Sequence, residues 1–164
     1  MTSTNSPGYS AAQIGLHWLI AALVLVQLLF GESMVEVVDA AEEGGQASAT
    51  DVLLSGVHYW AGIAILALVA LRLVLRLTSG VQAPRPSSLV EWAASAMHWA
   101  FYALLFMVPI SGLVALYIND EVGDIHSLAK PVFIVLVAAH AAAALYHQFI
   151  FKDGTLRRML VPRS

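Results

Sequence analysis

The chain has 164 residues, of which 59% are hydrophobic and only 12% are charged, and its formal net charge is −3. A soluble domain carries about twice that share of charged residues and cannot bury so much apolar surface. The charge balance argues against a nucleic-acid partner. The absence of cysteine excludes disulfides, cysteine-bound iron–sulfur clusters and thiol catalysis. The composition therefore predicts a membrane protein.

Four long stretches without Asp, Glu, Lys or Arg divide the sequence, covering residues 1–31, 52–71, 92–119 and 131–151. A helix of about 20 apolar residues crosses a bilayer, and lipid cannot satisfy open backbone groups. We therefore expect one all-α domain, residues 1–164. It is predicted to be a four-helix transmembrane bundle with helices at about 11–33, 54–77, 90–117 and 124–151. The first stretch lacks the basic start of a cleavable signal peptide and is long enough to span. The expected first two loops are Glu42–Gly45 and Ala83–Ser88.

The basic residues predict the orientation of this bundle. Seven of the eight Lys and Arg residues fall on one side, and only Lys130 falls on the other. By the positive-inside rule, both termini and the second loop are expected to be cytoplasmic. The opposite, outer side holds nine carboxylates against Lys130, a formal charge of −8. Arg157 and Arg158 are interpreted as an anchor on anionic membrane lipid.

Four histidines fall at two matched depths of the predicted bundle. His58 and His126 are expected near the outer ends of their helices, and His17 and His140 near the inner ends. His126 and His140 are 14 residues apart, which separates them by roughly 21 Å and leaves them on nearly the same helix face. Two histidines that face each other across a bundle can bind one haem iron from both sides. Two such levels predict two haem groups.

Neighbouring residues are compatible with this interpretation. Gly62, one turn after His58, and the alanines around His140 leave room for a macrocycle, and Arg72 and Arg76 could pair with propionates of the inner haem. Taken alone, a membrane histidine is more often a helix–helix hydrogen bonder, and an alanine stripe more often marks close packing. Four histidines at two matched depths favour haem.

Two histidines remain outside this scheme. His98 lies about two turns into the third helix, near the inner level, and either competes as an inner ligand or bonds to another helix. His147 lies seven residues beyond His140, near the cytoplasmic surface. There it could give a proton to a reduced quinone, because imidazole titrates near neutral pH. The alternative for His147 is a side chain that snorkels to the interface.

In order and spacing, the sequence resembles the bacterial cytochrome b561 family over nearly the whole chain, from Ser10 to Met159. The matching segments are Ile14-Gly15-Leu16-His17-Trp18-Leu19, His58 with Gly62, Arg72 and Arg76, His98-Trp99-Ala100-Phe101-Tyr102, Pro109-Ile110-Ser111-Gly112, His140-Ala141-Ala142-Ala143-Ala144-Leu145-Tyr146-His147 and Phe151-Lys152-Asp153-Gly154-Thr155-Leu156-Arg157-Arg158-Met159.

The resemblance implies a bacterial inner-membrane cytochrome with two haem b groups. It implies that His17 pairs with His140, and His58 with His126, as axial ligands. The family links an electron source on the outer side to quinone near the inner haem. One branch resembles a superoxide:quinone oxidoreductase that takes protons from the cytoplasm, and there the residue matching His147 lies near the quinone.

The outer charge departs from that branch. Superoxide is an anion and is drawn in by basic residues, whereas here Lys130, one helical turn after His126, is the only outer cation. Lys130 alone could form a local funnel, and a protein or small-molecule donor is equally admissible. A second hypothesis is a haem-bearing anchor that docks a periplasmic dehydrogenase or electron-transfer protein without turnover of its own. A third, a small transporter with histidine proton relays, has no supporting repeat or broken-helix pair.

Overall fold

The computed structural model describes residues 9–78, 86 and 88–162, and every regular element in these residues is helical. The elements are α1 (Ala11–Glu42), α2 (Ala49–Thr78), α3 (Leu89–Tyr117), α4 (Val122–Ser127), α5 (Ala129–Tyr146), a π-helical turn η1 (His147–Phe151) and α6 (Thr155–Arg158). Four helical spans are long and apolar enough to cross a membrane: α1, α2, α3 and the combined segment Val122–Phe151. The predicted all-α protein with four apolar spans is therefore confirmed.

Serine side chains begin two of the four spans. The hydroxyl of Ser10 accepts the backbone N–H of Gln13, while the Gln13 side chain accepts the backbone N–H of Ser10, a reciprocal cap at the start of α1. Ser88 caps α3 by accepting the backbone N–H of Glu91. These bonds satisfy backbone donors that have no partner within the first helical turn. Apart from Pro86 and Ser88, the predicted second loop, Arg85 included, lies outside the described residues.

The first two helices are longer than expected. α1 continues nine residues beyond the expected end at residue 33, and α2 begins at Ala49 rather than at residue 54. The acidic residues after Gly31 mark where the apolar stretch ends, but a helix can continue into water because it satisfies its own backbone. α1 ends where Gly44 adopts a left-handed φ of 71°, and the N–H of Gly45 bonds back to the carbonyl of Ala40 at 2.8 Å.

The fourth span is divided where a single helix over residues 124–151 was expected. α4 ends at Ser127, α5 begins at Ala129, and η1 replaces the last turn. Pro131 has no N–H to donate to the carbonyl of Ser127, four residues earlier. The helix is therefore interrupted before Ala129, and the proline lies in the first turn of α5. The span ends at Lys152, which has a left-handed φ of 54°.

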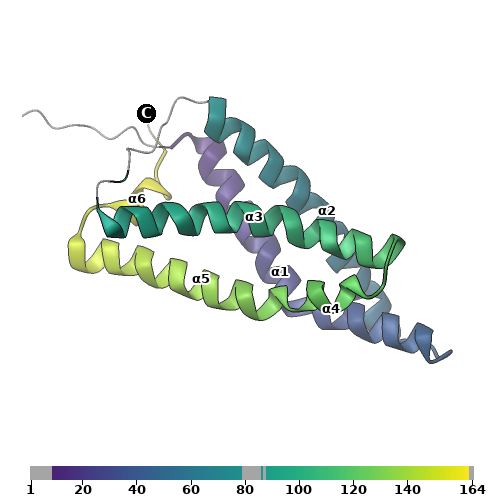
Figure 1. Ribbon diagram of the computed structural model, residues 1–164. Coiled ribbons are helices and arrows are strands. Elements are labelled where there is room, and N and C mark those ends of the chain that lie inside the picture. Colours follow the sequence, from purple (N-terminus) through teal and green to yellow (C-terminus); the bar gives the residue numbers. More distant parts are fainter. Residues whose placement is uncertain (1–8, 79–85, 87, 163–164) are drawn as a thin grey trace, which may run out of the picture.

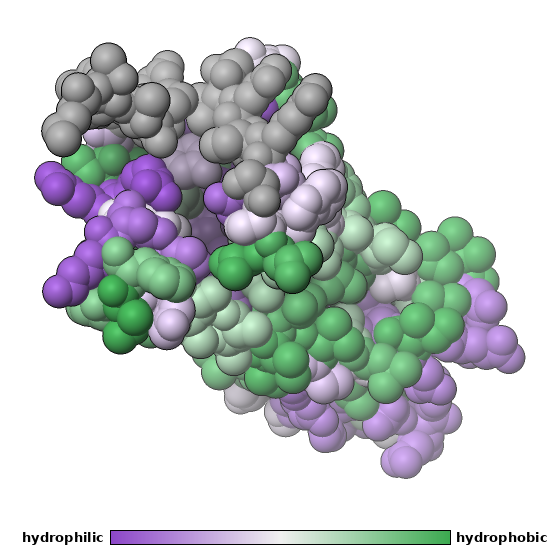
Figure 2. Space-filling view, turned by 60° about the vertical axis from the view of Figure 1, so that its left-hand side comes forward, coloured by the Kyte–Doolittle hydropathy of each residue, from purple (hydrophilic) through white to green (hydrophobic). Residues whose placement is uncertain are grey.

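The helices form two layers that cross obliquely. α1 and α2 form a closely packed antiparallel hairpin, and α3 and α5 lie side by side across it (Figure 1). Ile20, Val69 and Tyr102, from three helices, form the small buried core. Many large apolar side chains on all four spans are exposed, as expected for residues that face lipid. Figure 2 shows, on one face, an apolar region between two hydrophilic ends.

The two ends of the bundle differ in charge. The end that we call the acidic end carries Glu32, Glu36, Asp39, Glu42, Glu43, Asp51, Asp120, Glu121 and Asp124, together with Lys130. The end that we call the basic end carries Arg72, Arg76, Lys152, Arg157 and Arg158 among the described residues. The basic end holds both the start of α1 and the segment after η1, because the indole N–H of Trp18 donates to the carbonyl of Met159 at 2.8 Å.

Candidate functional site

His58 on α2 and His126 on α4 face each other at the acidic end. Their ring centroids are 6.0 Å apart and their planes are inclined by 81°. His126 lies on the short helix α4, and only Leu128 separates α4 from α5. We call these two residues the acidic-end pair.

Contacts with α3 hold the ring of His126. Its Nδ1 lies 2.9 Å from the carbonyl oxygen of Val108 and 3.2 Å from the hydroxyl of Ser111. A carbonyl oxygen only accepts, so Nδ1–H donates to Val108 and the lone pair is left on Nε2. A Cβ at Gly112 would lie 2.9 Å from the Cε1 of His126, so only glycine allows the ring to lie this close to α3. The sequence analysis did not connect these α3 residues to His126; the only sign of a close approach was the pair of small residues Ser111 and Gly112 after Pro109.

One small residue lies against the ring of His58. A Cβ at Gly31 on α1 would lie 3.6 Å from its ring, an ordinary contact. Gly62, predicted to leave room near His58, faces the amide nitrogen of Gln27, which would lie 3.0 Å from a Cβ there. The Nδ1 of His58 and the Oε1 of Gln27 are buried and have no hydrogen-bond partner among the described residues. Two unsatisfied polar atoms in an apolar interior fit a site that receives a further polar group.

The other predicted pair meets at the basic end. His17 on α1 and His140 on α5 have ring centroids 6.3 Å apart, and we call them the basic-end pair. His98 on α3 also reaches His140, at 5.5 Å, so three imidazoles gather there with His140 common to both contacts. The ring of Phe101 packs against His140 at 5.4 Å.

The spacing of both pairs fits iron between two imidazoles. A metal–nitrogen bond to imidazole is about 2.0 Å long and the ring centre lies about 1 Å behind the nitrogen, so two rings on opposite sides of one iron have centroids about 6 Å apart. The centroid distances of 6.0 and 6.3 Å agree with this value. Bis-histidine ligation needs no third protein side chain at either level.

Arg72 and Arg76 both lie at the basic end. Arg72 donates from Nη1 to the carbonyl oxygen of Gln13 at 2.7 Å, which ties α2 to the start of α1. The guanidinium of Arg76 lies 5.4 Å from the ring centre of Trp99 and 5.6 Å from that of Tyr102, within cation–π distance of both. Both arginines therefore contribute to packing, and Arg72 is also close enough to His17 for electrostatic interaction.

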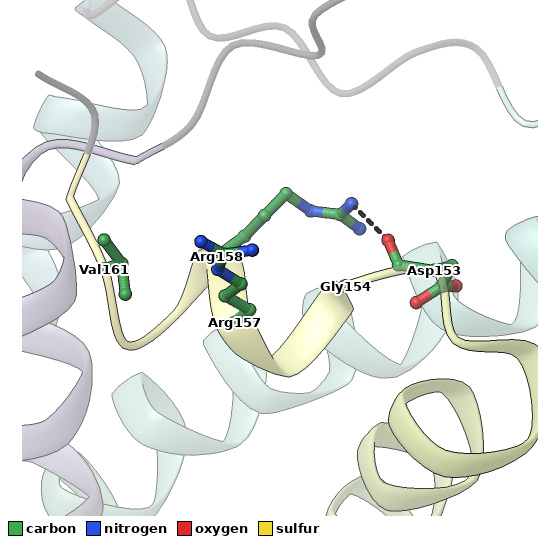
Figure 3. Close-up of a pocket in the computed structure, with 5 residues that line it drawn as sticks. All are labelled: Asp153, Gly154, Arg157, Arg158 and Val161. Carbon is green, nitrogen blue, oxygen red and sulfur yellow. Dashed lines mark hydrogen bonds between the residues drawn. The ribbon is translucent and has the colours of Figure 1, made fainter.

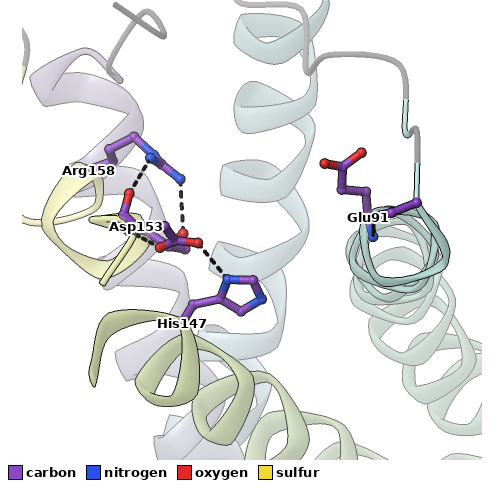
Figure 4. Close-up of polar contacts among 6 residues, drawn as sticks. Glu91, His147, Asp153 and Arg158 are labelled. Atoms are coloured by element: carbon purple, nitrogen blue, oxygen red, sulfur yellow. Dashed lines mark hydrogen bonds and ion pairs between the residues drawn. The ribbon is translucent and has the colours of Figure 1, made fainter. Parts of the chain in front are cut away.

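His147 is held by a carboxylate that the sequence analysis did not single out. Its Nδ1 lies 2.6 Å from the Oδ2 of Asp153, and Figure 4 shows the two side chains pointing toward each other. The backbone N–H of Thr155 donates to the other carboxylate oxygen, and Arg158 donates to the Asp153 carbonyl. Partial burial opposes ionisation, but the hydrogen bonds from Thr155 and His147 lower the pKa of Asp153 to about 2.

A shallow cavity lies beside this dyad. It has a volume of about 270 Å³ and is lined by Asp153, Gly154, Arg157, Arg158 and Val161 (Figure 3). The chain folds back here because Lys152 and Gly154 both have left-handed φ values. The reversal brings Asp153 to His147 and positions two arginines at the basic end.

Lys130, predicted as the cation nearest to His126, is paired. Its Nζ lies 2.9 Å from the Oε2 of Glu32 on α1, and both side chains are partly exposed. The sequence offered no signal for this partner, because residues 98 positions apart meet only in the folded bundle.

Comparison with known proteins gives one consistent result. A family model for prokaryotic cytochrome b561 matches residues 8–162. The chain is similar to a protein named cytochrome b562 from Cereibacter sphaeroides, with 34% identity over 98% of this chain and 99% of the relative. It is 29% identical to "Probable superoxide oxidase CybB" of Yersinia pestis, over 93% of this chain and 95% of the relative, and 28% identical to "Cytochrome b561 homolog 1" of Escherichia coli, over 95% and 98%. The chain is therefore a membrane cytochrome of the prokaryotic cytochrome b561 family.

Proposed function

We propose that the chain carries electrons between a donor at the acidic end and quinone at the basic end, through two haem b groups. Membership of the family implies haem b. The proposal of two haem groups rests on the two pairs of facing histidines, one at each end of the bundle, with centroid distances of 6.0 and 6.3 Å. When bound, haem b supplies an iron that is reversibly reduced and oxidised by one electron.

The surrounding side chains and backbone groups hold the rings of the proposed ligands in place. The hydrogen bond from Nδ1–H of His126 to Val108 orients its ring and leaves Nε2 free to bind metal. At the basic end, the packing of Phe101 against His140 restricts that ring. Arg72 and Arg76 are the residues that would stabilise propionate groups there, because Arg72 is close enough to His17, and both are close enough to His98, for electrostatic interaction.

The proposed orientation assigns each end of this pathway to one side of the membrane. The basic end carries Arg72, Arg76, Lys152, Arg157 and Arg158, so the positive-inside rule puts it, with both termini, on the cytoplasmic side. The acidic end then faces the periplasm. His126 and His140 are 14 residues apart, and electrons therefore cross roughly 21 Å of membrane between the two ligand pairs.

Reduction of a quinone to a quinol takes two electrons and two protons. We assign proton delivery to His147, which lies at the cytoplasmic end of the fourth span beside the ionised carboxylate of Asp153. The carboxylate accepts from Nδ1–H and so orients the ring, leaving the other nitrogen to face a substrate. Asp153 acts as a positioning residue in this scheme.

The test is quinone reduction by the purified protein in nanodiscs, with a one-electron donor added in excess. We expect His147→Ala to slow quinol formation at least tenfold, since positioned acid–base groups contribute about 10²–10⁴-fold. Haem reduction by the donor should be unchanged, and the matched control Tyr146→Phe should keep the wild-type rate. Unchanged quinol formation in His147→Ala would show that His147 does not deliver the proton. A wild-type protein that accepts electrons from the donor but forms no quinol would show that quinone is not the electron acceptor.

A second candidate is a haem-bearing anchor for a periplasmic electron-transfer protein. It is favoured by the unexpected extension of α1 to Glu42, which carries exposed carboxylates beyond the apolar span. Copurification of a basic partner, with turnover only in the complex, is the result that this candidate requires.

A further inference from the structure

The ion pair between Glu32 and Lys130 joins two residues that lie close in sequence to the acidic-end site. Glu32 directly follows Gly31, whose Cβ position is 3.6 Å from the ring of His58. Lys130 lies four residues after His126, at the start of α5. The contact between Nζ and Oε2 at 2.9 Å therefore joins two positions that each neighbour one of the facing histidines.

In this ion pair, the Glu32 carboxylate compensates the one positive side chain assigned to the acidic end. Lys130 is the only Lys or Arg assigned to this end, and the Glu32 carboxylate neutralises it. Glu36, Asp39 and Glu43 follow Glu32 at intervals of four, three and four residues, so they continue on the same face of α1, and all are exposed. A small ion that approaches His58 and His126 therefore meets a field set by carboxylates.

We propose that Glu32 determines the charge of the electron donor: by cancelling Lys130, it makes the acidic-end pair accept electrons faster from cationic or neutral donors than from anions such as superoxide. The inference rests on the proposed function, because it assumes electron entry at the acidic-end pair. The step is a one-electron oxidation of the donor in which no covalent bond within the donor forms or breaks, and haem held by His58 and His126 would supply the electron acceptor. Fields of this kind change association rates by up to 10–10³-fold.

The kinetic test compares two strong one-electron reductants of opposite charge. The sulfur dioxide radical anion from dithionite and the methyl viologen radical cation are mixed separately with oxidised protein in nanodiscs at low ionic strength, where screening is weak. A unit charge about 6 Å from the point of contact changes a rate about threefold in water. We expect Glu32→Gln to raise the rate with the anion and lower the rate with the cation, each by about threefold or more.

Glu36→Gln is the matched control, because it removes the same charge one helical turn away without freeing Lys130. It should change both rates by less than half as much as Glu32→Gln. Both variants leave the basic end unchanged, so a difference in rate between them must come from electron transfer at the acidic end. Equal effects of the two variants would overturn the assignment to Glu32.

A second readout is independent of haem. The chain has two lysines, Lys130 and the exposed Lys152, so amine acylation followed by peptide mass spectrometry measures one against the other. Glu32→Gln should raise the labelling of Lys130 relative to Lys152 by about threefold, and Glu36→Gln should not. Unchanged labelling would mean that the ion pair does not form and would overturn the inference. Wild-type protein without reducible haem would overturn the proposed function instead, and the labelling result would still stand.

Discussion

His126 illustrates how much of the site depends on single neighbours. Its ring lies against α3 because residue 112 has no side chain, and its Nδ1–H donates to the carbonyl of Val108. The hydrogen bond selects the tautomer that exposes Nε2, and the glycine selects the position of the ring. Both features come from α3, which carries neither member of the acidic-end pair.

Gly112→Ala should therefore displace His126. The added methyl group would lie 2.9 Å from Cε1, and overpacking of this kind costs about 1–3 kcal/mol when neither side can move freely. We expect the variant to lose one of two haem groups per chain and to melt at a lower temperature. Gly56→Ala on α2, where nothing lies within 4 Å, should keep both groups. Full haem content in Gly112→Ala would show that the ring position does not matter for binding.

The hydrogen bonds that Asp153 accepts from Thr155 and His147 predict a pH dependence of stability. The pKa of Asp153 is lowered to about 2 from a usual value of 3.8, so the folded state favours the carboxylate and gains stability above the usual value. That gain is lost as the pH falls from about 5 toward 2. Asp153→Asn should lower the melting temperature at pH 7, but only modestly because both side chains are partly exposed. The difference from wild type should shrink as the pH falls and should disappear below about pH 2.

The control for this measurement is Glu36→Gln, which also removes one carboxylate. It should show no comparable change in melting temperature between pH 7 and pH 2. A constant difference between Asp153→Asn and wild type at all pH values would mean that the effect comes from packing rather than from ionisation.

The elements could be predicted better than their ends. Charge-free stretches locate the four spans because they reflect the thickness of the bilayer. The ends of α1 and α2 depend instead on local backbone geometry, such as the left-handed φ of Gly44, and extend into water beyond the apolar stretch. The division of the fourth span follows from the missing N–H of Pro131. A proline in the first turn of a helix is tolerated and one in its interior interrupts it, so the effect of Pro131 depended on a helix start that the sequence did not locate.

Pro131→Ala tests whether this division positions His126. The variant restores an N–H for the carbonyl of Ser127, so we expect α4 and α5 to merge and His126 to turn away from His58. Haem content should fall by one group per chain, while the basic-end pair, which lies farther along α5, should keep its own group as an internal control. A variant with both groups retained would show that the break is not needed.

At the scale of the whole molecule, the histidine depths were predictable and the side-chain partners were not. Helix periodicity and the alternating direction of the spans indicated that His58 would meet His126 and His17 would meet His140, and the structure brings both pairs to about 6 Å. The pairs Glu32–Lys130 and His147–Asp153 depend on helix rotation and on a left-handed chain reversal, which a hydropathy pattern does not contain.

The most direct measurement is the number of haem groups per chain in the purified protein, from a dithionite-reduced minus oxidised visible spectrum with protein quantified on the same sample. We expect two low-spin b-type haem groups per chain, one for each facing histidine pair. One group per chain would contradict the assignment of one pair and would favour the cluster of His17, His98 and His140 as the single site. No haem would contradict the electron-transfer function altogether.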